Sequence, residues 1–203
     1  MEQKIRIFTG HYGSGKTTAV LNEALDLAAQ GKRVIAVDLD TVNPYFRLND
    51  ERARLEAAGV EVIAPQFAGS NLDIPSVPAD FMKIFSADCD AVFIDIGGDD
   101  DGAVVLRGYR ERFEEAGYQM ILVVNLRRPL TQTCRELEEA ADSIERASGL
   151  KVTQVVNNTN VGKTLQKKPE DFPDSELRAF AERRALPIYF PRISRFLEMP
   201  WEK

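Results

Sequence analysis

The strongest constraint on the fold is a glycine-rich segment near the start of the chain. Residues 10–17 read GHYGSGKT, which satisfies the pattern G-x-x-x-x-G-K-[ST]. An apolar run at 5–8 precedes this segment, and a segment with helical periodicity follows it. In that context the pattern indicates a phosphate-binding loop between a strand and a helix, because glycines let backbone N–H groups approach phosphate oxygens and a helix N-terminus attracts anions.

The loop assigns expected roles to individual residues. Lys16 is expected to reach the β and γ phosphates of a nucleotide, and Thr17 is expected to ligate Mg²⁺. The nucleotide-binding residues predicted here are Gly13, Ser14, Gly15, Lys16, Thr17 and Thr18. The alternative, a pair of turn glycines beside an incidental lysine, is disfavoured by the strand and helix on either side. The sequence therefore predicts binding of the triphosphate end of a nucleotide together with magnesium.

Short apolar runs rich in β-forming residues recur along the chain, separated by segments long enough for crossover helices. They lie at 5–8, 34–37, 60–63, 91–94, 120–124, 152–156 and 188–190. Several are apolar at consecutive positions, which is typical of strands covered on both faces. We therefore predict a three-layer α/β/α fold with a mostly parallel sheet of roughly seven strands. No segment requires a second domain, so residues 1–203 are expected to form a single nucleotide-binding domain.

Helical periodicity predicts three covering helices, at 16–30, 133–148 and 174–184. Gly31 is placed to end the first helix in a left-handed conformation. Thr133 and Glu136 have the spacing of a capping box at the start of the second. Asp174 is the predicted N-cap of the third.

Acidic residues follow two of the predicted strands. Asp95 directly follows the run at 91–94 and is the candidate carboxylate for Mg²⁺ at the end of a strand. With Gly98 it forms D-x-x-G, in which the glycine N–H could sense the γ-phosphate and move a loop when that phosphate leaves. Asp38 and Asp40 alternate after the second strand, so their side chains point to the same side. One could hold water on magnesium and the other could orient the attacking water, or both could be solvent-facing strand-end acids.

The order of these motifs, GKTT, then D-x-D, then D-x-x-G, resembles the MinD/ParA-type branch of the SIMIBI P-loop ATPases, which includes nitrogenase iron protein. The resemblance covers roughly residues 3–160 and implies ATP and Mg²⁺ as cofactors. It implies catalytic roles for Lys16 and Asp40, with Asp40 positioning water. It also implies that Thr17, Asp38 and Asp95 hold magnesium.

The same resemblance implies a base-binding region late in the chain. There, Asn157 would read the adenine edge, and Pro191 and Arg192 would enclose the base. Guanine-specific relatives carry N-K-x-D, whereas residues 157–160 read NNTN, and the missing acid favours adenine. His11 occupies the position of the family's signature lysine, which contacts the partner's nucleotide across a dimer, so the departure puts that dimer in doubt.

Composition excludes several classes of function. A formal net charge of -6 and a pI near 5.0 disfavour a broad nucleic-acid surface. No apolar run is long enough to span a membrane, no secretory signal begins the chain, and no C-terminal helix resembles a membrane anchor, so we expect a cytoplasmic protein. Cys89, Cys134 and the single histidine provide too few ligands for zinc or an iron–sulfur cluster.

Three classes of function remain after these exclusions. The first is an ATPase whose ATP and ADP states are read by a protein partner or a second copy of the chain, and Tyr45 and Phe46 could contact such a partner. The second is a small-molecule kinase, or an ATP-dependent carboxylate-activating ligase resembling dethiobiotin synthetase, with Arg47 or Arg128 binding the substrate. A protein that binds nucleotide without hydrolysing it is a third possibility if the dimer never forms.

Overall fold

The computed structural model describes residues 3–40, 47–65, 77–98, 100–160 and 172–189. Its strands are β1 Ile5–Thr9, β2 Val34–Leu39, β3 Glu61–Ile63, β4 Ala91–Ile96, β5 Tyr118–Val124, β6 Gln154–Asn157 and β7 Ile188–Tyr189. Its α-helices are α1 Lys16–Ala29, α2 Arg52–Ala57, α3 Asp100–Ala103, α4 Arg110–Ala116, α5 Cys134–Ser148 and α6 Ser175–Arg183. Short 3₁₀ helices lie at η1 Leu48–Glu51, η2 Ala79–Phe85 and η3 Val104–Tyr109.

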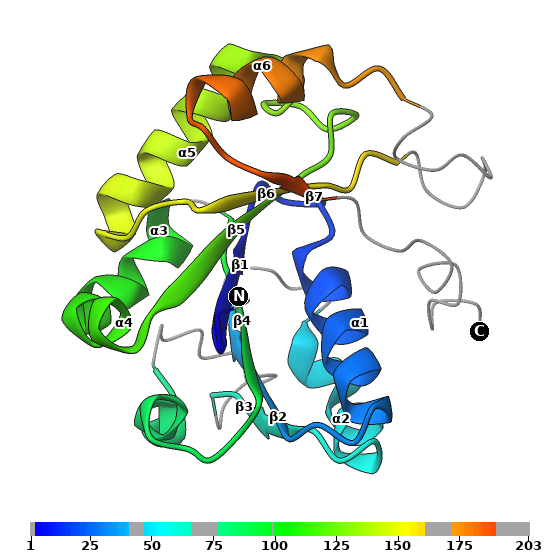
Figure 1. Ribbon diagram of the computed structural model, residues 1–203, viewed down its shortest axis with the longest axis vertical. Coiled ribbons are helices and arrows are strands. Elements are labelled where there is room, and N and C mark those ends of the chain that lie inside the picture. The colour runs from blue at the N-terminus through cyan, green and yellow to red at the C-terminus, as the bar shows by residue number, and fades with distance from the viewer. Residues whose placement is uncertain (1–2, 41–46, 66–76, 99, 161–171, 190–203) are drawn as a thin grey trace, which may run out of the picture.

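The strands form one parallel seven-stranded sheet in the order β3-β2-β4-β1-β5-β6-β7. The predicted fold is confirmed, and a strand overlaps every predicted run. β1 lies at the centre between β4 and β5 (Figure 1). Because parallel strands all end at the same edge, the loops after β1, β2, β4, β5 and β6 are neighbours there, where ligands bind in open α/β sheets.

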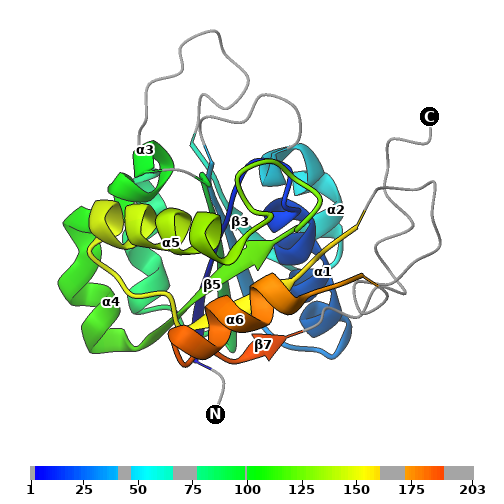
Figure 2. The same ribbon diagram turned by 90° about the horizontal axis from the view of Figure 1, so that it is seen from above.

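Helices cover both faces of the sheet. Helices α1 and α2 lie on one face, and α3, α4 and α5 lie on the other (Figures 1 and 2). The strand side chains alternate between two cores: Phe8 and Phe93 face α1, whereas Ile7 and Ile94 belong to the core that includes Ile144 of α5. Burial on both sides explains why the strands are apolar at consecutive positions.

All three predicted helix ends lie where the sequence places them. Gly31 follows α1 with a φ of 76°. At the start of α5, Glu136 donates its N–H to the Thr133 hydroxyl at 3.3 Å, and its carboxylate accepts the Thr133 N–H at 2.9 Å. Asp174 is the N-cap residue of α6, as predicted, but its side chain makes no capping bond, and its carboxylate instead accepts from Arg178 Nε at 2.9 Å. Its ψ of 16° departs from the extended backbone typical of an N-cap.

The short helices between β2 and β5 have no counterpart in the sequence predictions. In α4, Phe113 is the one buried residue, so the helix has no repeating apolar face from which a period could be read. Within the described ranges, none of the helices is both long and apolar enough to cross a membrane.

Candidate functional site

The loop between β1 and α1 has a backbone conformation that depends on glycine. Gly10, Gly13 and Gly15 have φ values of 137°, 75° and 94°, a region in which residues with a Cβ are strained. Space is also limited, because a Cβ on Gly10 would lie 2.2 Å from the carbonyl oxygen of Val123 in β5. The Ser14 N–H donates to the His11 carbonyl at 3.0 Å and closes the turn before α1 begins. The sequence therefore builds the loop that its motif predicts.

Lys16, at the start of α1, is buried where several loops meet. Its Nζ lies 4.0 Å from Oδ2 of Asp40, which follows β2. The loop after β4 lies against the same ammonium, since a Cβ on Gly98 would be 3.1 Å from Lys16 Nζ and 2.0 Å from the Gly10 carbonyl oxygen. The structure therefore brings Lys16, Asp40 and Gly98 into one site.

Asp38 and Asp95 are opposite each other on the adjacent strands β2 and β4. The Asp38 carboxylate accepts the N–H of Asp40 at 3.2 Å and the N–H of Asn49 at 2.9 Å. Burial raises the pKa of Asp38 to about 6; the Asn49 N–H opposes this rise and the Asp40 charge adds to it. The carboxylate of Asp95 is 0% exposed, and neither oxygen has a hydrogen-bond partner among the described residues.

Burial raises the pKa of Asp95 to about 8, although the positive charge of Lys16 lowers it. The Asp38 charge raises it further, and the nearby Thr17 hydroxyl lowers it without making a bond of normal geometry. A buried carboxylate without a partner is unfavourable unless a cation contacts it. In the ligand-free protein the Asp95 carboxylate therefore favours the binding of a cation beside it.

The oxygen-rich donor set fits Mg²⁺. Hydroxyl and carboxylate oxygens are hard ligands, and Mg²⁺ is commonly held by one or two carboxylates plus substrate phosphates rather than by a cage of protein groups. Consistent with this, the described part of the chain contains no group of three or more His, Cys, Asp or Glu side chains that could hold a metal. The buried hydroxyls of Thr9 and Ser14, which lack partners among the described residues, are further polar groups near the loop.

The ends of β5 and β6 are joined by side-chain amides. Asn125 follows β5, and its Nδ2 donates to the Asn160 carbonyl at 3.2 Å while its Oδ1 accepts the Asn160 N–H at 3.3 Å. Asn157, at the end of β6, accepts the Thr159 N–H at 3.0 Å. Its Nδ2 is buried and has no hydrogen-bond partner among the described residues.

Two side chains hold the glycine-rich loop from outside, and sequence reasoning singled out only one of them. Arg128, already a candidate, donates from Nε to the Gly13 carbonyl at 3.3 Å. Asn158, which was not predicted, donates from Nδ2 to the Ser14 carbonyl at 2.7 Å across 144 positions of sequence. No local pattern marks Asn158; the only available signal was its place in the NNTN run at the shared sheet edge.

Pro191, Arg192, Tyr45 and Phe46 lie outside the described residues. Arg47 lies at the start of η1, where its backbone N–H donates to Asp50 at 3.0 Å.

A family model described as the CobQ/CobB/MinD/ParA nucleotide-binding domain matches residues 5–188. The chain belongs to this family. The resemblance predicted from the motif order is thereby confirmed, and the glycine-rich loop is the P-loop of a nucleotide-binding domain. No curated protein sequence matches the chain.

Solved structures support the same fold. A nucleotide-binding protein from Archaeoglobus fulgidus in complex with ADP has a TM-score of 0.56 and 18% identity, over 96% of this chain and 84% of that one. The signal recognition particle 54 kDa protein from Aeropyrum pernix in complex with GDP has a TM-score of 0.59 and 16% identity, over 98% and 47%. The receptor FtsY from Elizabethkingia anophelis has a TM-score of 0.57 and 18% identity, over 93% of this chain but only 58% of its own length. The chain therefore corresponds to part of the signal recognition particle proteins it resembles.

Proposed function

We propose that the protein is a magnesium-dependent ATPase that acts as a nucleotide-dependent switch on a partner. The observation that carries this proposal is the buried carboxyl group of Asp95, which lies near Lys16 and Asp38 and has no hydrogen-bond partner among the described residues. A site that only packed the core would have no reason to bury a carboxyl group there. A bound Mg²⁺ and a triphosphate account for it.

In this proposal the residues of the site have distinct roles. Thr17, Asp38 and Asp95 would hold Mg²⁺, which neutralises charge on the phosphates when bound. Lys16 stabilises the negative charge that develops on the β and γ phosphates. Asp40 orients a water molecule, whose oxygen bonds to the γ-phosphorus as the bond from that phosphorus to the β–γ bridging oxygen breaks, giving ADP and phosphate.

The switch element in this proposal is the D-x-x-G loop. Gly98 packs closely against the Gly10 carbonyl and Lys16 Nζ, and its N–H would respond when the γ-phosphate leaves. Movement of that loop would change the surface that a protein partner or second copy reads.

The proposed base is adenine. The buried Nδ2 of Asn157 offers a donor to the base, and an asparagine, Asn160, stands where a guanine-binding site has an acid. The fold itself accepts either base, since the Archaeoglobus fulgidus protein contains ADP and the Aeropyrum pernix protein contains GDP. Calorimetric titration with Mg·ATP and Mg·GTP tests the assignment, and tighter binding of GTP would contradict it.

Single-turnover hydrolysis tests the catalytic role of Asp40. We expect Asp40→Ala to bind Mg·ATP but to hydrolyse it on the order of 100-fold more slowly, because positioned groups of this kind contribute at least that factor. The control is Glu115→Ala, which removes an exposed carboxylate of α4. An Asp40→Ala variant as fast as the parent would show that the water-positioning role is wrong.

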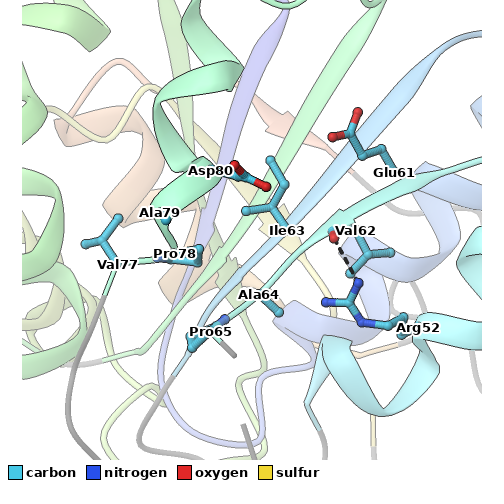
Figure 3. Close-up of a pocket in the computed structure, with 10 residues that line it drawn as sticks. All are labelled: Arg52, Glu61, Val62, Ile63, Ala64, Pro65, Val77, Pro78, Ala79 and Asp80. Carbon is cyan, nitrogen blue, oxygen red and sulfur yellow. Dashed lines mark hydrogen bonds between the residues drawn. The ribbon is translucent and has the colours of Figure 1, made fainter. Parts of the chain in front are cut away.

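A cavity beside the site supports the second candidate, a small-molecule kinase or carboxylate-activating ligase. It has a volume of about 380 Å³ and lies between β3, α2 and the start of η2 (Figure 3). Its lining includes Arg52 and the ends of the described chain at Pro65 and Val77. Ile63 of β3 pairs with Val37, the residue before Asp38, so an acceptor here would be one strand from the proposed magnesium site. Phosphate release that required a small acceptor, rather than a macromolecular partner, would favour this candidate.

A further inference from the structure

Asn158 occupies a junction between two parts of the site that the sequence separates widely. Its backbone N–H donates to the Val124 carbonyl at 2.7 Å, which fixes the residue at the end of β5. Its backbone carbonyl accepts from Asn160 Nδ2 at 2.7 Å. It directly follows Asn157, whose buried amide is the proposed base contact. Asn158 is itself buried, with 6% of its surface exposed.

The side chain of Asn158 reaches the P-loop and fixes one peptide unit. Nδ2 donates to the Ser14 carbonyl at 2.7 Å, and a Cβ on Gly15 would lie 2.3 Å from the same nitrogen. No described peptide bond is cis, and a trans peptide holds its C=O and N–H on opposite sides of one plane. Holding the Ser14 carbonyl against Asn158 therefore directs the Gly15 N–H toward the opposite side of the loop, away from Asn158.

We propose that Asn158 is a positioning residue that couples base binding to the shape of the phosphate cradle. The inference rests on the proposed nucleotide binding, but not on hydrolysis or on the identity of a partner. A base held by Asn157 fixes the start of the loop after β6. Through Asn158 this also fixes the Ser14–Gly15 peptide that faces the phosphates. Asn158 touches neither base nor phosphate in this scheme and acts through the backbone.

Calorimetry with two ligands separates this coupling from a general loss of stability. Mg·ATP carries base and phosphates, whereas Mg·tripolyphosphate carries phosphates alone. We expect Asn158→Ala to weaken tripolyphosphate binding about threefold to tenfold, the effect of losing one ordinary hydrogen bond. ATP binding should weaken by a larger factor, so that the preference for ATP over tripolyphosphate falls.

Gln119→Ala is the matched control, because it removes an amide donor of β5 that contacts Gln154 and neither the P-loop nor Asn157–Asn160. It should leave the preference for ATP within about twofold of the parent value, below the effect of one hydrogen bond. Asn158→Asp keeps the size of the side chain and removes the donor, so it provides the measurement if the alanine variant does not fold.

The possible results separate the two proposals. A parent protein that binds neither ligand would overturn the proposed function and the role of Asn158 with it. A parent that binds both, with an unchanged preference in Asn158→Ala or Asn158→Asp, would overturn the coupling role alone.

Discussion

Asp95→Asn should remove a pH dependence of stability that the buried carboxylate imposes on the ligand-free protein. The pKa of Asp95 is about 8 in the folded protein, against an ordinary value of 3.8. Between these values the folded state holds a proton that the unfolded state has released. Stability from this residue is therefore fully present below the unfolded pKa and is lost as the pH rises through the folded pKa.

The size of the effect follows from the proton difference. One proton corresponds to about 1.4 kcal/mol for each pH unit. Between about pH 6 and pH 8, Asp95 should lower the free energy of unfolding by roughly 2 kcal/mol after allowing for its partial titration near pH 8. Asp38, with a pKa of about 6, contributes mainly below this window.

Urea unfolding with EDTA and without nucleotide measures this difference. The parent should lose about 2 kcal/mol between the two pH values, and Asp95→Asn should lose little. Asp80→Asn, at an exposed position, should behave as the parent. The same dependence on pH in the parent and Asp95→Asn would refute the reasoning. If Asp95 contacts the metal as proposed, added Mg·ATP should make the parent's free energy of unfolding less dependent on pH. The pH dependence of Asp95→Asn should not change.

Two further variants test the P-loop surroundings. Gly98→Ala places a methyl group 2.0 Å from the Gly10 carbonyl oxygen; we expect a loss of roughly 1–3 kcal/mol in urea unfolding, as for overpacked sites, and weaker binding of Mg·ATP. Gly108→Ala is the control, since its new Cβ meets nothing within 4 Å. Arg128→Ala should weaken Mg·ATP binding several-fold in calorimetry, because the Gly13 carbonyl loses its donor at 3.3 Å; unchanged affinity would show that this contact does not shape the cradle.

The sequence was sufficient where a local pattern determines the structure. The strand positions follow from apolar runs covered on both faces, and the start of α5 follows from Thr133 and Glu136. One deviation involves a side chain that takes part in strand pairing: β6 begins at Gln154 rather than at 152. At Thr153 the N–H still donates to the Met120 carbonyl at 2.9 Å, but the Met120 N–H donates to the Thr153 hydroxyl, also at 2.9 Å.

The same distinction applies to the candidate site. Parallel strand ends meet at one edge, so the approach of Asp38, Asp95 and Lys16 could be expected from their motifs. The contact of Asn158 with Ser14 could not, because it depends on how two loops pack after the sheet has formed. Asparagine carries no periodic signal that would distinguish this position from its neighbours.

The central position of β1 also has a consequence for the order in which the chain folds during synthesis. The P-loop is continuous in sequence, but the contacts that shape it come from distant parts of the chain. Phe8, in the strand before the loop, pairs with Asp95, and the Ser14 carbonyl in the loop accepts a hydrogen bond from Asn158. Contacts so distant in sequence require large loops to close before they stabilise anything, which slows folding. During synthesis from the N-terminus, the first motif to emerge is thus among the last to acquire its final form. Nucleotide affinity should consequently arise late, once the ribosome has released the segment beyond residue 158.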